Sequence, residues 1–552
     1  MVGRIFGTLA KPIRGLHEAA YVLAGLTLAS QVLALLRDRL FAHEFGAGQV
    51  LDLYYAAFKV PDLVFALVAS LVSAYVLIPR IAGCGHDEAK RLISETASFL
   101  LIAGGALCVI IAYFAPEILT RLFPTFATGS DASVFVALTR VLLIQPILLG
   151  LSSIAMSVTQ VERRFLVFAL SPVLYNLGII GGTLFLYPSW GVLGIGAGVV
   201  IGAVAHLVIQ LPTLSAARLL PRFVIPSPRR ILAVVRDSVP RSLALGVGSF
   251  VTLILTSLAA RTGEGGVSIF TLATNLEAVP LSLIGASYAT AAFPALAEYA
   301  GKRQSELFIE TVRTAARHLI FWSSAVMVLA IVLRAHLVRV ILGSGAFDWD
   351  ATRLTAAVFA VLIIGLIAQG LILLASRAFY AAERSWNPLI IQIAGAVVSI
   401  GSAVGLFALS RTDAFLRVFV ESLFRVTDIG GTDVLFVALG ATLGQLVMAV
   451  CALVTLGVVA RGVALRLIRP MLEGLGAAIL GGAAAYGVLA FGGSIAPLTT
   501  LAAVFAEAAI AGIVGLAVAA AVLALLENEE FKNLVKALAH IRARVLPPQS
   551  EF

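Results

Sequence analysis

One apolar segment of the chain, residues 51–79, carries polar and charged side chains on a single helical face. At 100° per residue these side chains fall within a stripe about 80° wide. The stripe consists of Asp52, Tyr55, Lys59, Asp62, Ser70 and Ser73. Such a stripe is typical of a helix that lines a cavity, where a Lys ammonium can bind an anionic headgroup. The alternative interpretation is that Lys59 pairs with Asp62 or Asp52 and is neutralised between helices.

The preceding segment adds a second polar face. Thr27, Ser30, Gln31, Arg37 and Asp38 are spaced by three, four and seven residues, which places them on one broad face of a helix. Asp38 has two candidate partners, Arg37 and Lys59. We expect Arg37 and Asp38 at the mouth of a cavity, where Gly46-Ala47-Gly48 turns the chain back. An ion pair that only fixes the helix end is the alternative.

Two polar residues in later apolar segments are further candidates. Arg140 precedes the sequence LLIQPILLG, and because an Arg that faces lipid is costly, we expect it to point inward or to reach the membrane interface. Asn275 shares a helical stripe with Thr271 and Ser282, and bonds to neighbouring helices are its alternative role. Glu277 lies on nearly the opposite face, which indicates another partner or a position near the interface.

The segments that position these residues are those of an all-α polytopic membrane protein. Of the 552 residues, 60% are hydrophobic and 12% are charged, and the mean hydropathy is +1.03. A soluble protein is excluded, because its surface would be largely apolar. About fourteen segments approach the ~20-residue length of a membrane helix. They are predicted at residues 17–36, 53–79, 94–114, 133–158, 165–187, 190–213, 238–260, 267–296, 316–343, 353–379, 387–409, 432–459, 471–491 and 499–526.

Basic residues between these segments predict the orientation. The net charge is +9, and most Lys and Arg residues fall in loops that are cytoplasmic when the N-terminus is inside. An even number of crossings returns the C-terminus to the cytoplasm, where the tail Leu525–Phe552 is predicted to form a short helix at the inner surface. In such a protein the positive charge sets topology, so it does not indicate nucleic acid.

An internal repeat predicts two equivalent halves. The matching residues are Pro79 with Pro294, Ala82 with Ala297, Leu92 with Leu307, and Glu95-Thr96 with Glu310-Thr311, at a spacing of 215. A weaker match pairs Glu162-Arg163 with Glu383-Arg384. Because each half has six helices, both enter the membrane from the same side, and the repeat is parallel.

The repeat also predicts the domains. They are a six-helix lobe over residues 1–230, a second over 231–460, two additional membrane helices over 461–526 and a cytoplasmic tail over 527–552. Substrate sites in transporters of this kind lie between the halves. We therefore predict that Arg37, Lys59 and Arg140 point toward that space.

Motifs for catalysis and for metal binding are absent from the sequence. It holds no GxxxxGK[ST] loop, no HExxH and no GxSxG. The three cysteines, Cys84, Cys108 and Cys451, are interpreted as free structural thiols. We expect a transporter or scaffold that is not an enzyme and that needs no cofactor or metal.

One predicted external connection, residues 410–433, is unusual. It contains AFLRVFVESLFRV, in which apolar residues alternate with Arg417, Glu421 and Arg425. This pattern fits an amphipathic helix on the outer leaflet, and a helix packed within an extracellular loop fits it equally.

Three stretches carry a resemblance to a known family. RDRLFAHEFGAGQVLDLYYAAFKVPDLVFAL, followed by AYVLIPRIA, resembles the start of the MurJ/MviN family of lipid II flippases, in the multidrug/oligosaccharidyl-lipid/polysaccharide exporter superfamily. QVERRFLVFALSPVLYNLGIIGG and ATNLEAVPLSLIGASYATAAFPALAEYA resemble later segments of that family. The order and spacing agree over most of the chain.

The resemblance implies fourteen helices with both ends in the cytoplasm of a bacterium. Two lobes of six helices would alternate around a central cationic cavity, and the last two helices would form a groove for a lipid tail. The implied activity is translocation of the polyprenyl-diphosphate-linked precursor lipid II across the cytoplasmic membrane, driven by ion gradients or membrane potential. The implied partners are this lipid-linked glycan, membrane lipids and envelope-assembly proteins, and the chain is expected to be a monomer.

The sequence departs from the family pattern at the cavity. Ser30-Gln31 stands where the family has Ser-Arg, Pro61-Asp62 where it has Pro-Asn followed by Arg, and Thr274-Asn275 where it has Asp-Arg. Arg37-Asp38, Asp52 and Lys59 keep their positions. Export of another lipid-linked oligosaccharide or of an amphiphilic cation is therefore an alternative, and a scaffold that transports nothing is another.

Overall fold

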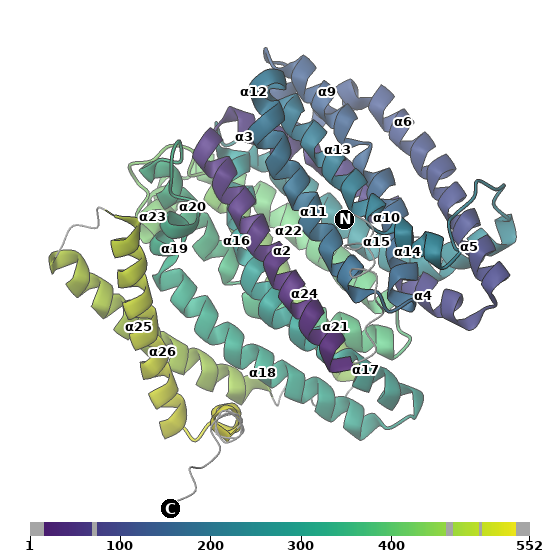
Figure 1. The fold of residues 1–552 in the computed structure, drawn as a ribbon. Helices are drawn as coiled ribbons and strands as arrows, with labels where there is room; N and C mark the ends of the chain where they lie inside the picture. Colours follow the sequence, from purple (N-terminus) through teal and green to yellow (C-terminus); the bar gives the residue numbers. More distant parts are fainter. Residues whose placement is uncertain (1–15, 69–73, 460–466, 496–499, 537–552) are drawn as a thin grey trace, which may run out of the picture. The chain divides into compact units, whose positions relative to one another are not determined.

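The structure of the chain is a computed structural model that describes residues 16–68, 74–459, 467–495 and 500–536 (Figure 1). Within these ranges every regular element is a helix and no strand occurs. This confirms the all-α class that the composition predicts. Ser70 and Ser73, the end of the predicted polar stripe, lie outside the described residues.

Long apolar helices make the chain a multi-pass membrane protein. Eleven helices in the described residues are long and apolar enough to cross a membrane, or up to twelve if a pair bent by 45° counts as one span. The bent pair consists of α20 (Trp349–Ile363) and α21 (Leu366–Ala381). Two further long helices, α2 (Leu16–Phe45) and α3 (Gln49–Val68), are not among the eleven. The number fourteen stays a prediction.

The chain forms two compact units. The first unit extends to Thr271 and includes Ser344–Ala351; the second consists of Leu272–Gly343 and the chain from Thr352. The lobe boundaries at residues 230 and 460 stay predictions from the sequence.

The first unit contains a long series of helices around a buried apolar core. After α2 and α3 these are α4 (Ala74–Gly83), α5 (His86–Phe99), η2 (Leu100–Gly104), α6 (Gly105–Tyr113), α7 (Ala115–Leu122), α8 (Pro124–Ala127), α9 (Ala132–Leu142), α10 (Gln145–Val161), α11 (Phe165–Gly181), η3 (Gly182–Leu186), α12 (Tyr187–Trp190), α13 (Val192–Val208), α14 (Leu211–Ala216), α15 (Pro228–Ala259) and the start of α16 (Gly266–Pro280). The segments labelled η are π-helical turns, which widen a helix by one residue.

Glycines hold α11 against α13 in this unit, side by side in Figure 1. A Cβ added at Gly178 would overlap the backbone of Gly202, and one added at Gly182 would lie 2.5 Å from the Cα of Gly198. These glycines repeat every four residues on both helices, which is the pattern that lets membrane helices approach closely. The pair therefore packs backbone to backbone, and α11 has little freedom to shift.

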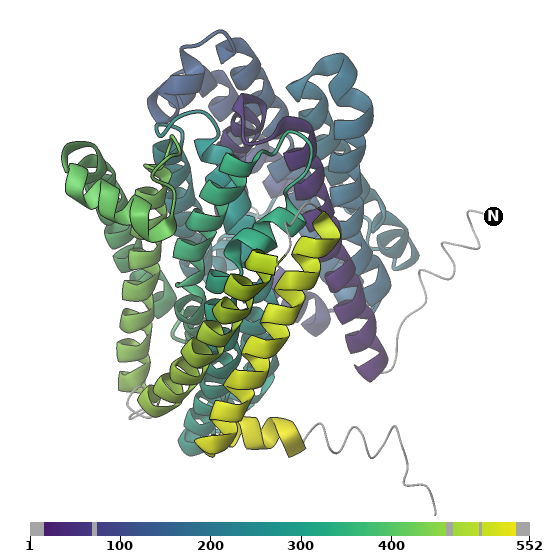
Figure 2. The same cartoon turned by 90° about the vertical axis from the view of Figure 1, so that its left-hand side faces the viewer.

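The second unit contains the remaining helices. These are the rest of α16, η4 (Leu281–Ala286), α17 (Ser287–Gly301), α18 (Ser305–Val332), α19 (Arg334–Ile341), α20, α21, α22 (Trp386–Thr412), α23 (Ala414–Phe424), α24 (Val434–Val459), α25 (Ile468–Ile495) and α26 (Leu501–Leu525). Helix α24 packs along α22, and α25 packs along α26, as Figure 2 shows for the latter pair. Leu319 and Phe379 are among the fully buried side chains of its core.

Two helix ends, one in each unit, have the same backbone conformation. Helix α10 is followed by Arg163 and α21 by Glu383, each with a left-handed φ of 57°. These residues are 220 apart (383 − 163), whereas the predicted match of Glu162 with Glu383 has a spacing of 221 (383 − 162). The internal repeat itself stays a prediction from the sequence.

The connection after α22 contains a helix, α23, with two different faces. Asp413 caps its N-terminus by accepting hydrogen bonds from two backbone N–H groups. On the packed face, Glu421 is buried and accepts from Arg417 at 2.9 Å and from Thr432 at 2.5 Å. On the other face Phe415, Val418, Phe419 and Leu423 are exposed. The predicted helix is confirmed. The buried Glu421 shows that one face packs within the connection, whereas a position on the outer leaflet stays a prediction for the exposed face.

A short helical segment, residues 529–536, follows α26 and turns sharply away from it (Figure 2). Arg317 on α18 pairs with Glu529 and Glu530, and Asn528 donates to Glu473 on α25 at 2.8 Å. The helix predicted for the tail is confirmed over this segment, and the rest of the tail lies outside the described residues.

Candidate functional site

The guanidinium of Arg37, on α2 in the first unit, is held by two acceptors. Its Nε and Nη2 donate to Oδ1 of Asp38 at 3.1 and 2.8 Å, and its Nη1 donates to Oδ1 of Asn176 on α11 at 3.0 Å. Asn176 is itself oriented, because its Nδ2 donates to the carbonyl oxygen of Pro172 at 3.1 Å. The ion pair between Arg37 and Asp38 confirms the first of the two partners predicted for Asp38.

Lys59 and Asp62 lie one turn apart on α3, and both side chains are half-buried. They attract each other electrostatically. Among the described residues, however, neither forms a hydrogen bond or an ion pair within 4.0 Å. The ammonium of Lys59 is therefore available to donate hydrogen bonds to a bound group, and the carboxylate of Asp62 is available to accept them.

Hydroxyl and amide groups surround these charges. Tyr175 on α11 interacts electrostatically with both Asp62 and Arg37, and Gln145 on α10 donates to its Oη at 3.0 Å. Within the described ranges, the Oη of Tyr55 and the Oε1 of Gln145 are buried without a hydrogen-bond partner. Both atoms can accept a hydrogen bond from a bound group, and the Oη of Tyr55 can also donate one, although similar atoms also occur elsewhere in the described chain.

Asp52 has a different environment from the rest of the polar stripe. It is fully buried, and its Oδ2 accepts from the backbone N–H of Gly265 at 2.8 Å while its Oδ1 accepts from the N–H and Oγ of Ser268 at 2.7 and 2.5 Å. These donors lie at the start of α16, where the first N–H groups of a helix have no intrahelical acceptor. Asp52 thus caps α16, and these bonds explain its position without a ligand.

The other predicted site residues do not contact the Arg37 group. Gln31 is half-buried on α2, six residues before Arg37. Arg140 on α9 is exposed, and its Nε donates to the carbonyl oxygen of Ala112 at 2.9 Å, near the end of α6. Asn275 belongs to the second unit, where it is half-buried and has an interaction partner.

The charges of the site balance. Arg37 and Lys59 supply two cations, and Asp38 and Asp62 supply two carboxylates. Arg37 is already committed to hydrogen bonds, whereas Lys59 is not. Lys59 is thus the cation of this group that has no hydrogen bond within the described residues.

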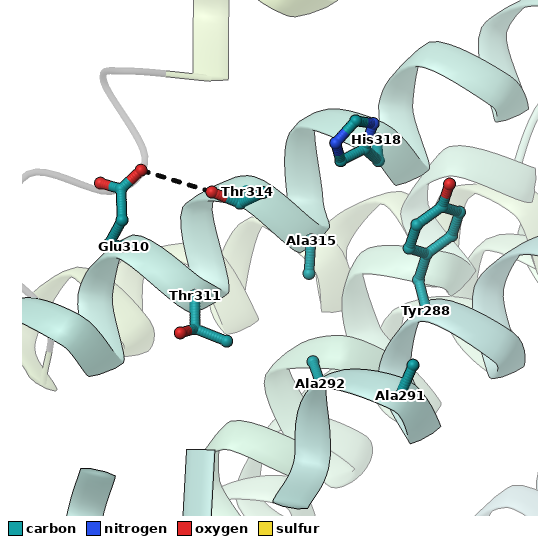
Figure 3. Close-up of a pocket in the computed structure, with 8 residues that line it drawn as sticks. All are labelled: Tyr288, Ala291, Ala292, Glu310, Thr311, Thr314, Ala315 and His318. Atoms are coloured by element: carbon teal, nitrogen blue, oxygen red, sulfur yellow. Dashed lines mark hydrogen bonds between the residues drawn. The ribbon is translucent and has the colours of Figure 1, made fainter. Parts of the chain in front are cut away.

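The second unit has a cavity of about 340 Å³ between α17 and α18 (Figure 3). Tyr288 stacks on His318 with 5.9 Å between the ring centroids, and Glu310 accepts from Thr314 at 3.3 Å. Alanine side chains line much of the remainder, and none of the lining residues is Lys or Arg. Because a diphosphate needs cationic donors, this cavity is not suited to an anionic headgroup.

A family model described as lipid II flippase MurJ matches residues 41–491. The chain belongs to the MurJ family. The match spans α3, with Lys59 and Asp62, and α11, with Asn176. The family resemblance seen in the sequence is confirmed.

Curated relatives of this MurJ-family chain agree with that assignment. A lipid II flippase MurJ of Burkholderia cenocepacia is 28% identical over 400 residues, which cover 70% of this chain and 77% of the relative. A probable lipid II flippase MurJ of Rhizobium tropici is 26% identical over 403 residues, which cover 69% of this chain and 73% of the relative.

Solved structures show that the fold is the one found in this family and in a related transporter class. The structure of a lipid II flippase MurJ in an inward closed conformation matches with a TM-score of 0.73 at 18% identity, covering 92% of this chain and all of that one. An inward-facing multidrug resistance transporter of the MATE family and MOP superfamily matches with a TM-score of 0.62, also at 18% identity, covering 82% and 98%. At these identities the likeness concerns the fold alone.

Sequence reasoning missed several side chains of the site in this MurJ-family protein. Asn176, Tyr175 and Gln145 lie in apolar segments, where single polar residues usually bond neighbouring helices. Asn176 and Tyr175 stand in the quoted stretch QVERRFLVFALSPVLYNLGIIGG. The single Asn inside this apolar segment could have indicated a polar site. Its contact with Arg37, however, follows only from the packing of α11 on α2.

Proposed function

We propose that this protein is a flippase that moves lipid II across the bacterial cytoplasmic membrane by alternating access. The observation that carries the proposal is the family match over residues 41–491, together with curated relatives named lipid II flippase. The protein acts as a transporter and not as a catalyst. Both termini lie in the cytoplasm, as the distribution of basic residues predicts.

The first step of recognition is made by Lys59. Its half-buried ammonium interacts with Asp62 only through space, so it can donate to a diphosphate without first breaking a hydrogen bond. Each charge-assisted hydrogen bond of this kind contributes roughly 1.5–3 kcal/mol. The prenyl tail stays in lipid, and only the headgroup needs a polar path.

Arg37 acts as the second, fixed cation. Asp38 and Asn176 hold its guanidinium in place, so little side-chain entropy is lost when a phosphate oxygen approaches. Its positive charge is partly offset by Asp38. Arg37 therefore orients the headgroup, while Lys59 supplies most of the attraction.

Asp62 supports a second candidate function, export of an amphiphilic cation. Its carboxylate accepts no hydrogen bond and has no ion-pair partner within 4.0 Å among the described residues. A bound organic cation would find a carboxylate there and Tyr175 nearby. The same argument applies to a lipid-linked oligosaccharide with a less anionic head.

Complementation tests the proposal. Cells depleted of their own lipid II flippase receive the wild type, Lys59→Ala, Arg37→Ala or the control Lys302→Ala, whose Lys lies in an exposed turn. We expect growth with the wild type and the control, and loss of growth with Lys59→Ala. Wild type that reaches the membrane without restoring growth refutes lipid II as the cargo. Binding of purified protein to lipid II and to a lipophilic cation then separates the two candidates.

A further inference from the structure

Glu277 on α16 is a buried acid without a basic partner. Its side chain belongs to the second unit and the residue is 3% exposed. Within the described residues its one hydrogen bond comes from the amide of Gln369 on α21, and no Lys, Arg or His pairs with it. An ionised carboxylate in such a setting has lost its water and has gained no counter-charge.

The backbone around Glu277 is irregular on both sides. Helix α16 passes into the π-helix η4 directly after Pro280. Opposite it, α20 and α21 meet at a bend of 45°, and Gln369 lies just after that bend, near the N-terminus of α21. π-Helical turns and broken membrane helices recur at sites where transporters bind ions.

The hydrogen bond from Gln369 fixes the carboxyl group of Glu277. Close packing in turn holds the start of α21, because a Cβ added at Gly285 in η4 would lie 3.1 Å from the Cα of Gly370, the residue after Gln369. Gln369 lies in the first turn of α21, where the positive end of the helix dipole favours a nearby carboxylate. Burial favours the neutral form instead, so the two effects oppose each other at this side chain.

Other charged groups near this pair are few. Helix α16 carries no second charged residue, and η4 and α24 carry none. Arg377, the one charged residue of α21, lies eight residues beyond Gln369, a rise of about 12 Å. Its guanidinium packs over the ring of Phe293, 5.7 Å from the centroid. Helices α17, α18 and α22 also pack against α21 and carry charged residues. Among the described residues, none of these pairs with Glu277 or acts on it electrostatically; burial and the hydrogen bond from Gln369 alone set its environment.

A metal ion fits this site poorly. Metal cations in proteins need several oxygen or nitrogen ligands, whereas Gln369 turns an N–H donor toward the carboxylate. In the described part of the chain no group of three or more His, Cys, Asp or Glu residues is placed to hold a metal. A proton needs only the carboxylate oxygen.

We propose that Glu277 is a proton-binding site through which the second unit responds to a proton gradient. The O–H bond forms on the carboxylate with a proton taken from water on one side of the membrane, and it breaks when the proton returns to water on the other side. Gln369 holds the carboxyl group in both states. The coupling of this step to lipid II movement rests on the proposed function, whereas proton binding itself does not.

Difference infrared spectroscopy of the purified full-length protein in lipid nanodiscs tests proton binding. A protonated carboxyl group gives a C=O stretch that ionised carboxylates lack. We expect this band in the wild type, its loss in Glu277→Gln, and its retention in Glu421→Gln, the matched control in which a buried Glu is paired with Arg417. Gln369→Leu should shift the band, because it removes the hydrogen bond. A wild-type spectrum without this band at any pH between the acid and alkaline limits of folding, or a band unchanged in Glu277→Gln, overturns the proposal.

Transport in proteoliposomes tests the coupling. Lipid II movement by the wild type should respond to an imposed pH gradient, and movement by Glu277→Gln should not. A variant that responds as the wild type does would overturn the coupling. If the wild type moves no lipid II at all, the proposed function fails, while the infrared result still decides whether Glu277 binds a proton.

Discussion

Removal of the Asp52 carboxylate should destabilise the protein without removing its binding site. Asp52→Ala leaves the backbone N–H groups of Gly265 and Ser268 buried without an acceptor. Each such group costs roughly 1–3 kcal/mol, and relief from burying the carboxylate offsets part of the sum. The two N–H groups together cost about 2–6 kcal/mol before that offset, so we expect a net loss of about 3 kcal/mol, more than the ~1 kcal/mol typical of a lost helix cap.

Two further variants extend this prediction to an order of stability. Asp52→Asn keeps an oxygen for Ser268 but presents an amide to the N–H of Gly265, so its stability should lie between those of Asp52→Ala and the wild type. Lys59→Ala removes a half-buried side chain that makes no hydrogen bond in the described structure. It should unfold at nearly the wild-type temperature and yet bind lipid II more weakly.

Thermal unfolding in nanodiscs measures the order of stability. The free thiol of Cys108 is buried, whereas those of Cys84 and Cys451 are half-buried. With Cys84 and Cys451 replaced by Ser in every variant, a thiol-reactive fluorescent dye reports when the first unit opens. Binding of lipid II is measured on the same samples well below the unfolding midpoint. The reasoning is refuted if Asp52→Ala unfolds with the wild type, or if Lys59→Ala unfolds as early as Asp52→Ala.

Three other outcomes follow from the packing. Gly182→Leu should abolish folded protein, because the backbone of Gly198 occupies the required space, whereas Gly181→Ala, with nothing within 4 Å, should express normally. Phe415→Trp on the exposed face of α23 should be quenched by brominated lipid, and a Trp that stays unquenched would show that this face lies outside the bilayer. Arg317 lowers the pKa of Glu529. The stabilisation that this ion pair gives to the docked tail is therefore fully present above the usual Glu pKa and is lost as pH falls through the lowered value. Limited proteolysis should show the tail released in that acidic window, and Arg317→Gln should release it at neutral pH.

The fold class was predictable because the length of an uninterrupted apolar segment is enough to identify a membrane helix. The class came from composition and the family from the quoted stretches, whereas the parallel arrangement of the two halves stays a prediction. The number of spans was less accessible, because α3 carries Asp52, Lys59 and Asp62 within 20 residues and so resembles a membrane helix only in part. Helix ends were also less accessible, since local backbone geometry and not residue identity marks the ends of α10 and α21 at Arg163 and Glu383.

The site was predictable in its residue types but not in its partners. The polar stripe on α3 correctly placed Lys59 near Asp62, because helical periodicity operates over one turn. It also placed Asp52 in the same group, whereas the acceptor role of Asp52 depends on Ser268, more than two hundred residues away. The second partner of Arg37, Asn176, is equally remote in sequence. Glu277 was expected to have either another partner or a position near the interface, and the structure gives it a partner, Gln369.

The left-handed residues that follow α10 and α21 show what each helix end costs. Glycine adopts this conformation without strain, whereas other L-residues incur roughly 1–2 kcal/mol. Arg163 and Glu383 nevertheless occupy these positions, and both side chains are exposed. A glycine would end each helix at lower cost, but it would remove an exposed charge from the turn. Each turn therefore exchanges some backbone stability for a charged side chain at the helix end.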